Sequence, residues 1–275
     1  MYETMDFYVL YNRFLKKEGY QTLPRRPLEK RKLRYEDVYP ILYLKYRLSR
    51  QAERSNIKHL VIDEMQDYSL LQYLIIRRMF SCKMTILGDR AQTMADQQQD
   101  VLQFLPGIFG KDLRRIEMRK SYRNTVEIAS YAANLIGVTD LELFERHGMP
   151  VLERDVSDLE AALREAVDTL FPDEKTYETA AVIVPDEKTA ERAYLILREI
   201  LAEKDFDCGK RLSWLNRDSS SFKKGLTVTT FYLAKGLEFD QVVSIFPKDE
   251  KREMMMQAQY IAATRALHEL RVYHI

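Results

Sequence analysis

The sequence contains little cysteine and little histidine. Its 275 residues include two cysteines, Cys82 and Cys208, that lie far apart, and four histidines without metal-ligand spacing. A disulfide framework or a zinc site is therefore not expected, and the two thiols are typical of a reducing compartment. The sequence also lacks an apolar run of eighteen or more residues, and its acidic start is unlike a signal peptide. We therefore expect a cytoplasmic protein with no membrane partner.

Net charge is nearly absent as well. The 43 basic side chains exceed the 42 acidic ones by a single charge, so the chain has no global basic field, and any contact with nucleic acid must come from a local patch. One stretch offers such a patch, because "LPRRPLEKRKLRYEDVYP" (23–40) carries six Lys or Arg between prolines. The simpler interpretation is a solvated loop, and the alternative is a loop that contacts a phosphate backbone.

The pattern of apolar segments favours an α/β fold. Apolar residues make up 46% of the chain, which is enough for a sizeable core. The strand-like segments "KHLVID" (58–63) and "KMTILGD" (83–89) flank a helical segment from Tyr68 to about Phe80, which predicts a βαβ unit with parallel strands. Further strand and helix patterns follow. "RRIEMRKSYRNTVEIASYAANLIG" (114–137) predicts a strand that feeds a helix, and the chain is expected to close with the helix "MMMQAQYIAATRALHEL" (254–270) and the strand "RVYHI" (271–275). We predict two parallel-sheet lobes, residues 1–120 and residues 121–275.

Acidic residues follow the first of these strands abruptly. Asp63 and Glu64 end an apolar run, and Asp89 ends the next strand. The carboxyl ends of strands are where open α/β sheets bind ligands. An Asp at such a position can hold Mg²⁺, and a neighbouring Glu can deprotonate an attacking water, which is the chemistry of nucleotide hydrolysis. The Asp-Glu pair alone is weak evidence, because many strands end in acid at a solvated edge.

Five short motifs make the interpretation specific. In chain order they are "DEMQD" (63–67), "GDRAQ" (88–92), "SYRN" (121–124), "TFYLAKGLEFD" (230–240) and "AATRA" (262–266). Together they resemble the later motifs of superfamily-1 helicases of the UvrD/Rep type, over about residues 57–275. The resemblance implies two RecA-like lobes that hydrolyse ATP with Mg²⁺ and act on single-stranded DNA.

The resemblance also implies a role for residues of the first lobe. Asp63 and Glu64 would hold Mg²⁺, and Glu64 would act as the catalytic base. Gln66 would lie at the nucleotide and couple it to neighbouring loops. Gln92 would sense the γ-phosphate, a role that its amide can fill as donor and acceptor.

Residues of the second lobe receive roles in the same way. Arg123 and Arg265 would face the terminal phosphate, where a guanidinium stabilises charge on the transferring phosphoryl group. Glu238 and Gly236 would contact the nucleotide. Three further residues would couple the ATP state to the nucleic-acid backbone, namely Thr229, Thr230 and Lys235. Taken singly these residues have ordinary explanations, since Arg123 could pair with Glu127 and Arg265 could be a solvated helix charge.

One essential part of such a motor is missing from the sequence. The phosphate loop G-x-x-x-x-G-K-[ST] is absent, because Gly209-Lys210 is followed by Arg211 and lacks the upstream glycine. Only 62 residues precede Asp63. We expect the chain to be a C-terminal part of a longer protein, whose upstream half supplies the phosphate loop and without which ATP is hydrolysed poorly or not at all.

Two departures leave the biological role open. UvrD-type helicases carry base-stacking aromatics after "GDxxQ", whereas "TMADQQQD" (93–100) contains none and the first aromatic residue is Phe104. Tyr232 replaces the histidine of T-x-H-x-A-K-G. Both departures resemble the HelD branch, whose ATPases remodel RNA polymerase. A non-catalytic interaction module is a second alternative, and a nuclease that uses Asp63, Glu64 and Asp67 is a third, although its carboxylates would be unusually local.

Overall fold

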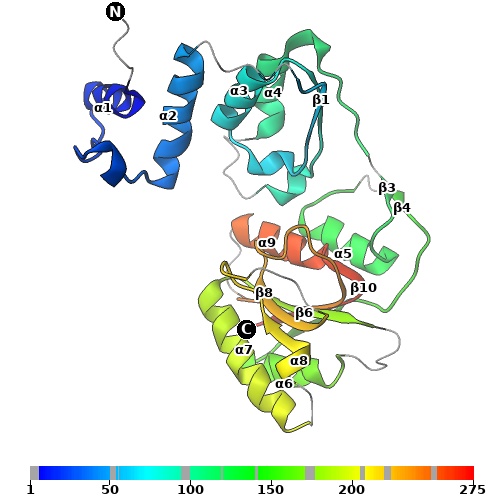
Figure 1. Cartoon of the computed structure of the whole chain (residues 1–275). Helices are drawn as coiled ribbons and strands as arrows, with labels where there is room; N and C mark the ends of the chain where they lie inside the picture. The colour runs from blue at the N-terminus through cyan, green and yellow to red at the C-terminus, as the bar shows by residue number, and fades with distance from the viewer. Residues whose placement is uncertain are drawn as a thin grey trace, which may run out of the picture. The chain divides into compact units, whose positions relative to one another are not determined.

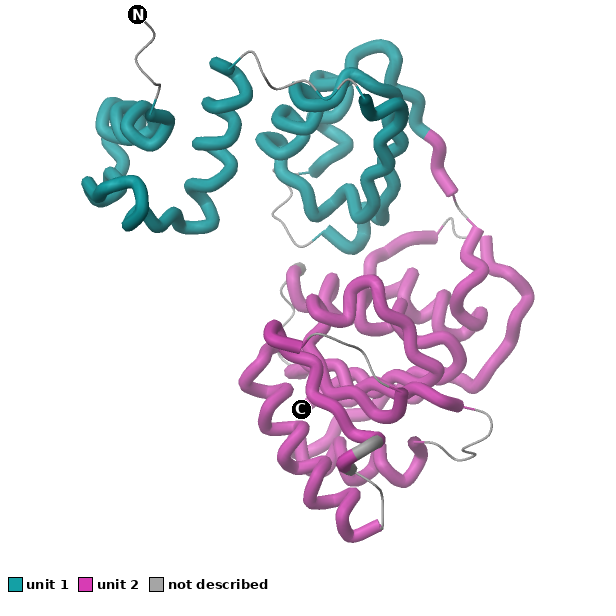
Figure 2. Tube along the Cα trace, in the orientation of Figure 1, with its two compact units in different colours: residues 1–115 teal, residues 116–275 magenta. Residues whose placement is uncertain are grey.

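The computed structural model describes residues 6–49, 54, 56–93, 100–118, 120–139, 142–170, 177–204, 208–219, 224–248 and 253–275. The chain divides into two compact units, residues 1–115 and residues 116–275 (Figure 2). Each unit has hydrophobic cores of its own. Among the described residues, no helix combines the length and the apolar character that crossing a membrane requires.

The first unit begins with two helices, α1 (Phe7–Lys17) and α2 (Tyr35–Leu48) (Figure 1). Helix α1 starts where it does because Asp6 caps it, accepting hydrogen bonds from the backbone N–H groups of Tyr8 and Val9. The helices pack through a small core that also contains Leu23 and Leu44. The connector between them holds the short helix η1 (Leu28–Lys30) and is largely exposed, which both interpretations of this stretch require.

The second part of this unit is the predicted βαβ unit. Strand β1 (His59–Ile62) leads through η2 (Met65–Asp67) to α3 (Leu70–Met79) and then to β2 (Lys83–Ile86), and the two strands pair in parallel. Helix α3 begins two residues later than predicted, because Ser69 forms a capping box with Gln72. After β2 come η3 (Arg90–Gln92), α4 (Val101–Phe109) and η5 (Gly110–Asp112). The core beneath the strands centres on Tyr73.

The second unit is built on a six-stranded sheet in the order β5-β10-β9-β6-β8-β7, in which every pairing is parallel. The strands are β5 (Leu152–Asp155), β6 (Thr179–Val184), β7 (Leu212–Trp214), β8 (Gly225–Thr230), β9 (Phe239–Phe246) and β10 (Ala266–His274). This arrangement confirms the predicted α/β class. Strands β6, β8 and β9 are buried almost throughout, as expected for parallel strands covered on both faces.

Helices cover both faces of that sheet (Figure 1). One face packs against α6 (Leu159–Val167) and α7 (Glu187–Ala202), and the other packs against α5 (Val126–Leu135) and α9 (Glu253–Ala263). The short helix α8 (Cys208–Arg211) precedes β7. Strands β3 (Lys120–Ser121) and β4 (Glu142–Leu143) form a separate two-stranded sheet.

One expectation about this unit is wrong, and another is confirmed only in part. The helical pattern predicts that the last helix continues through residues 266–270, but α9 ends at Ala263 and β10 begins at Ala266. Because β10 lies between β5 and β9 and pairs with both, tertiary pairing overrides the local helical preference. The strand expected before α5 shrinks to the two residues of β3, which pair with β4 and not with the large sheet.

Candidate functional site

The acidic pair of the first unit lies directly after β1. Asp63 is exposed, and its Oδ1 accepts a hydrogen bond of 2.8 Å from the backbone N–H of Glu64. Glu64 has φ 52° and ψ 51°, in the left-handed region, and is the non-glycine residue with positive φ in the described part of the chain. Such a conformation is uncommon for a residue with a side chain and is often found at functional sites. The backbone therefore turns sharply between the two carboxylates.

Gln66 connects this pair to the next motif. The side chain is buried, and its Nε2 donates a hydrogen bond to Oε2 of Glu64. At its other end, Oε1 accepts a hydrogen bond of 3.1 Å from the backbone N–H of Asp89. An amide can do both because it carries a donor and an acceptor. Gln66 therefore fixes the orientation of the Glu64 carboxylate relative to the loop that follows β2.

A close backbone approach holds the same two loops together. The backbone N–H of Met65 donates to the carbonyl of Leu87 at 2.8 Å. A Cβ atom at Gly88 would lie 2.6 Å from the backbone nitrogen of Met65 and would also overlap its side chain. Only glycine leaves room for this approach, which explains why the second motif begins with Gly88.

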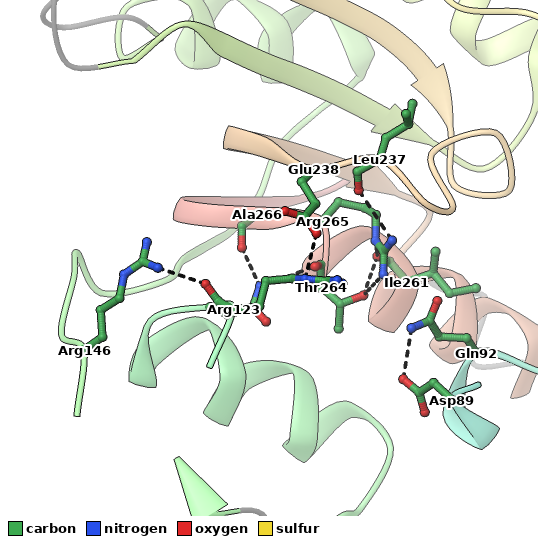
Figure 3. A network of polar contacts seen from close by, with 11 residues as sticks. Asp89, Gln92, Arg123, Arg146, Leu237, Glu238, Ile261, Thr264, Arg265 and Ala266 are labelled. Carbon is green, nitrogen blue, oxygen red and sulfur yellow. Dashed lines mark hydrogen bonds and ion pairs between the residues drawn. The ribbon is translucent and has the colours of Figure 1, made fainter. Parts of the chain in front are cut away.

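The remaining polar residues of that motif form a local network. Asp89 caps η3, its Oδ1 accepting from the backbone N–H of Ala91 at 2.9 Å. Its Oδ2 accepts from Nε2 of Gln92 at 3.0 Å (Figure 3). The buried Gln92 is thus tied through Asp89 to Gln66 and, through it, to Glu64. The role of Gln92 as a γ-phosphate sensor stays a prediction.

The acidic residues of this unit are suited to a lightly coordinated cation. No group of three or more His, Cys, Asp or Glu side chains in the described residues could hold a metal ion, so Asp63, Glu64 and Asp67 give no support to a nuclease with a carboxylate-rich metal site. Mg²⁺ bound with a nucleotide needs less, because phosphates and waters supply most of its ligands. The exposed Asp63, at the carboxyl end of a strand, fits that smaller demand.

In the second unit, Arg123 forms an ion pair with Glu238 (Figure 3). Arg123 Nε lies 2.8 Å from Oε1 of Glu238, and the side chains are 49% and 42% exposed. The alternative pairing of Arg123 with Glu127 is wrong. Glu127 instead accepts a 2.9 Å hydrogen bond from the backbone N–H of Gly148, and its Oε1 lies 3.0 Å from Nδ1 of His147. The hydrogen bond from His147, together with backbone N–H groups, lowers the pKa of Glu127 to about 2.

Arg265 is buried, with 2% of its surface exposed, so the alternative of a solvated helix charge is wrong as well. Its guanidinium donates to the carbonyl of Ile261 at 3.3 Å, to the carbonyl of Leu237 at 3.4 Å and to Oγ1 of Thr264 at 3.1 Å (Figure 3). Its own carbonyl accepts from the backbone N–H of Phe239 at 3.0 Å. Arg265 is therefore fixed where β9 and β10 begin.

Asn124 brings the motifs of the two arginines together. Thr125, not Asn124, caps α5, which leaves the buried Asn124 amide to donate to the carbonyls of Ala266 at 2.5 Å and Thr264 at 3.3 Å. These two residues flank Arg265 on either side. Because Asn124 follows Arg123 directly, its amide sets the position of one arginine relative to the other.

Arg146 supports the same arrangement and was not foreseen. Its Nη1 donates to the carbonyl of Arg123 at 3.0 Å (Figure 3). Its Nη2 donates to the carbonyl of Leu267 at 3.0 Å. The sequence around Arg146 carries no motif, and one arginine in an acidic segment gives no signal of such a role. The position of Arg146 becomes informative only when the fold is known.

The residues expected to couple ATP to nucleic acid lie at the carboxyl edge of the sheet and on the connection that follows it. Thr229 and Thr230 end β8 and are fully buried, at the carboxyl edge. Oγ1 of Thr229 donates to the carbonyl of Leu215 at 3.1 Å, whereas Oγ1 of Thr230 has no hydrogen-bond partner among the described residues. Glu238 precedes β9 at the amino edge. Lys235 and Gly236, whose φ is 77°, lie on the connection between the two edges.

Comparison with known proteins gives one family match. Residues 2–94 match the model of the UvrD/REP helicase N-terminal domain. No curated protein matches the chain. Among solved structures, the C-terminal domain of a "possible DNA helicase" from Lactobacillus plantarum WCFS1 is 24% identical, with 56% of this chain and 88% of that chain covered and a TM-score of 0.44.

Two viral helicase structures are also similar. The PRRSV helicase is 18% identical, with 79% of this chain and 35% of that chain covered and a TM-score of 0.42. The Arterivirus nonstructural protein 10 helicase, solved with DNA, is 13% identical, with 79% and 39% covered and a TM-score of 0.41. The chain thus spans well under half the length of these two helicases. The family resemblance is carried by residues 2–94, which are similar to the N-terminal domain of UvrD/REP helicases.

Proposed function

We propose that the chain is the C-terminal part of an ATP-dependent superfamily-1, UvrD-like DNA helicase or translocase. The observation that carries the proposal is the hydrogen-bonded unit of "DEMQD" and "GDRAQ", in which Gln66 joins Glu64 to Asp89. These two motifs lie in the segment that matches the UvrD/REP family model. An ordinary acidic strand end has no need of such a buried bridge.

The carboxylates of the first unit would carry out the chemistry. ATP with Mg²⁺ supplies the phosphoryl group and a cation that neutralises its charge. Asp63 would hold the cation directly or through water, and Glu64 would take the proton of the attacking water. Gln66 would keep the Glu64 carboxylate in one orientation through its hydrogen bond.

The arginines of the second unit would stabilise the charge that develops on the phosphoryl oxygens. The two have different surroundings. Arg123 is half exposed and pairs with Glu238, so it can exchange a carboxylate for a phosphate at little cost. Arg265 is buried among backbone carbonyls and would act from a fixed position. Glu238, released from Arg123, would be available to the nucleotide.

The upstream half of the motor would complete the first unit. Its β1–β2 sheet has only two strands in the described residues, and isolated two-stranded sheets are marginally stable. One face carries Val61, 60% exposed, and Leu87, 45% exposed. An upstream segment that contains the phosphate loop would cover this face and pair with a free edge, burying both side chains.

ATP turnover tests the proposal most simply. This chain alone should release no phosphate above background, and the chain extended by its upstream half should turn ATP over in a manner that single-stranded DNA stimulates. Phosphate release by the chain alone would contradict the role assigned to the upstream half. If the upstream coding sequence contains no phosphate loop, a non-catalytic interaction module is the function that remains.

A HelD-type ATPase that remodels RNA polymerase is the second candidate, and the identity of residue 232 favours it. Tyr232 replaces the histidine expected in its motif, and its ring packs edge-on against Phe231 at 5.4 Å and lies 5.9 Å from the guanidinium of Arg217. Residues 94–99, which hold most of the departure after "GDRAQ", lie outside the described residues. ATP turnover that ignores DNA and responds to RNA polymerase would favour this candidate.

A further inference from the structure

The connector between α1 and α2 concentrates positive charge in a chain that is nearly neutral. Residues 24–34 contain six Lys or Arg and one acid, Glu29, whereas the whole chain has a net charge of +1. Two of the six side chains are used within the fold. Arg31 forms a two-pronged pair with Asp6, at 2.9 and 2.7 Å, and Arg34 Nε donates to Oδ2 of Asp37 at 2.8 Å.

The Arg31–Asp6 pair and three further hydrogen bonds hold the connector against α1, and the Arg34–Asp37 pair joins its other end to α2. Asn12 donates to the carbonyl of Leu23 at 3.2 Å and accepts from its N–H at 2.7 Å, and the hydroxyl of Tyr8 donates to the carbonyl of Pro24 at 2.7 Å. The guanidinium of Arg31 also lies over the ring of Tyr8, 4.6 Å from its centre. The loop is thus fixed at both ends, and less ordering is needed when it binds a partner.

Four basic side chains remain, and all are exposed. They form no ion pair within the described residues and comprise Arg25, Arg26, Lys30 and Lys32. Like charges held so close together repel one another, and a polyanion relieves the repulsion and releases its own counterions on binding. The planar forks of the two arginines match phosphate oxygens in particular. These side chains therefore fit a polyanion with regularly spaced phosphate groups.

Exposed aromatic rings at the ends of the connector indicate which class of polyanion it binds. Tyr20 is 65% exposed and Tyr35 is 74% exposed. Aromatic rings beside a basic groove stack on unpaired bases, whatever the sequence. An acidic protein surface would use the cations but would leave these rings without a matching contact.

We propose that residues 20–35 form a binding site for single-stranded nucleic acid, in which Arg25, Arg26, Lys30 and Lys32 contact phosphates and Tyr20 and Tyr35 stack on bases. The site lies outside all five motifs of the proposed motor. The binding site goes beyond the proposed function, because it concerns affinity for nucleic acid in the absence of nucleotide. Equilibrium binding measures that affinity whether or not the extended protein hydrolyses ATP.

The test compares two triple variants of the full chain that remove the same number of charges. R25Q/R26Q/K32Q changes the connector, and K188Q/R192Q/R198Q removes three exposed charges from α7. Fluorescence anisotropy of a labelled single-stranded oligonucleotide gives the affinity of each over a range of salt concentrations. The connector variant should bind about tenfold to a hundredfold more weakly at 0.1 M salt, and its slope of log K against log salt should fall by about 2.

The α7 variant should bind as the wild-type chain does. A connector variant that matches wild type in affinity and slope would overturn the proposal, and so would equal losses in both variants. Y20A/Y35A should weaken binding of the single strand by about fivefold or more while leaving duplex binding unchanged. If the connector variant no longer binds poly-L-glutamate but still binds the oligonucleotide, the partner is an acidic protein and the proposal is wrong. Circular dichroism verifies that each variant is folded.

Discussion

The side-chain amide of Gln66 donates a hydrogen bond to the carboxylate of Glu64, the residue assigned here as catalytic base. The same amide accepts from the backbone N–H of Asp89, so the two residues are joined within a buried network that spans two motifs. A charge-assisted hydrogen bond contributes more than one between neutral groups. The orientation of Glu64 therefore depends on Gln66.

Gln66→Leu should lower the kcat of the extended protein by about tenfold to a hundredfold, because a hydrogen bond to a charged group is worth about 1.5–3 kcal/mol. KM for ATP should change little, since Gln66 acts on the carboxylate and not on the bound phosphates. Gln103→Leu, at an exposed position of α4, is the matched control. Equal effects of both substitutions, or a rise in KM alone, would contradict the positioning role.

Gly88→Ala should destabilise the first unit by about 1–3 kcal/mol, the usual range for forcing an extra methyl group into a packed site. The added Cβ would lie 2.6 Å from the backbone nitrogen of Met65. At Gly107, inside α4, a Cβ meets nothing within 4 Å, so Gly107→Ala should be neutral or stabilising. Urea unfolding of both variants measures the difference, and equal stabilities would refute the close approach.

Asn124→Asp should destabilise the second unit by about 1–3 kcal/mol, because it places an acceptor against the carbonyls of Thr264 and Ala266 in place of a donor. Asn134→Asp makes the same chemical change at an exposed position of α5 and should cost little. Unfolding followed by circular dichroism compares the two. If Asn124→Asp proves as stable as its control, the amide does not hold the arginine motifs together.

Glu127 should make stability depend on pH in the acid range. Its pKa is about 2 in the folded chain, against an ordinary value of 4.5, chiefly because of the hydrogen bond with His147. A lowered folded pKa stabilises the fold above the unfolded value, and the contribution is lost as the pH falls through the folded one. Wild type should therefore exceed Glu127→Gln in stability above pH 4.5, and the gap should close between pH 4.5 and pH 2. A gap that does not depend on pH would contradict this assignment.

The sequence predicted the parts of the site that rest on local pattern. The parallel strands before Asp63 and Asp89 are recognisable from their apolar runs and acidic ends, and both form as expected. The bridge from Gln66 to Asp89 was foreseen only as a coupling role, because the hydrogen bonds that perform it depend on how closely the two loops pack. That packing requires a glycine at position 88, but the sequence alone does not show that Met65 lies beside it.

Sequence patterns do not predict the long-range contacts in the second unit. A spacing of one helical turn suggests Glu127 as the partner of Arg123, yet the partner is Glu238, directly before β9. The burial of Arg265 follows from the early start of β10, which local helical preference concealed. Arg146 donates hydrogen bonds to the carbonyls of Arg123 and Leu267, but it lies in a segment that carries no sequence motif.

The most direct test of the account is the Glu64→Gln variant of the extended protein, with ATP hydrolysis and ATP binding measured on the same preparation. The account predicts that kcat falls by about a hundredfold or more, as expected for the loss of a general base, while the Kd for ATP stays within about twofold of wild type. Glu64→Gln that hydrolyses ATP at the wild-type rate would contradict the assignment of Glu64 as the base and, with it, the proposed motor function of this site.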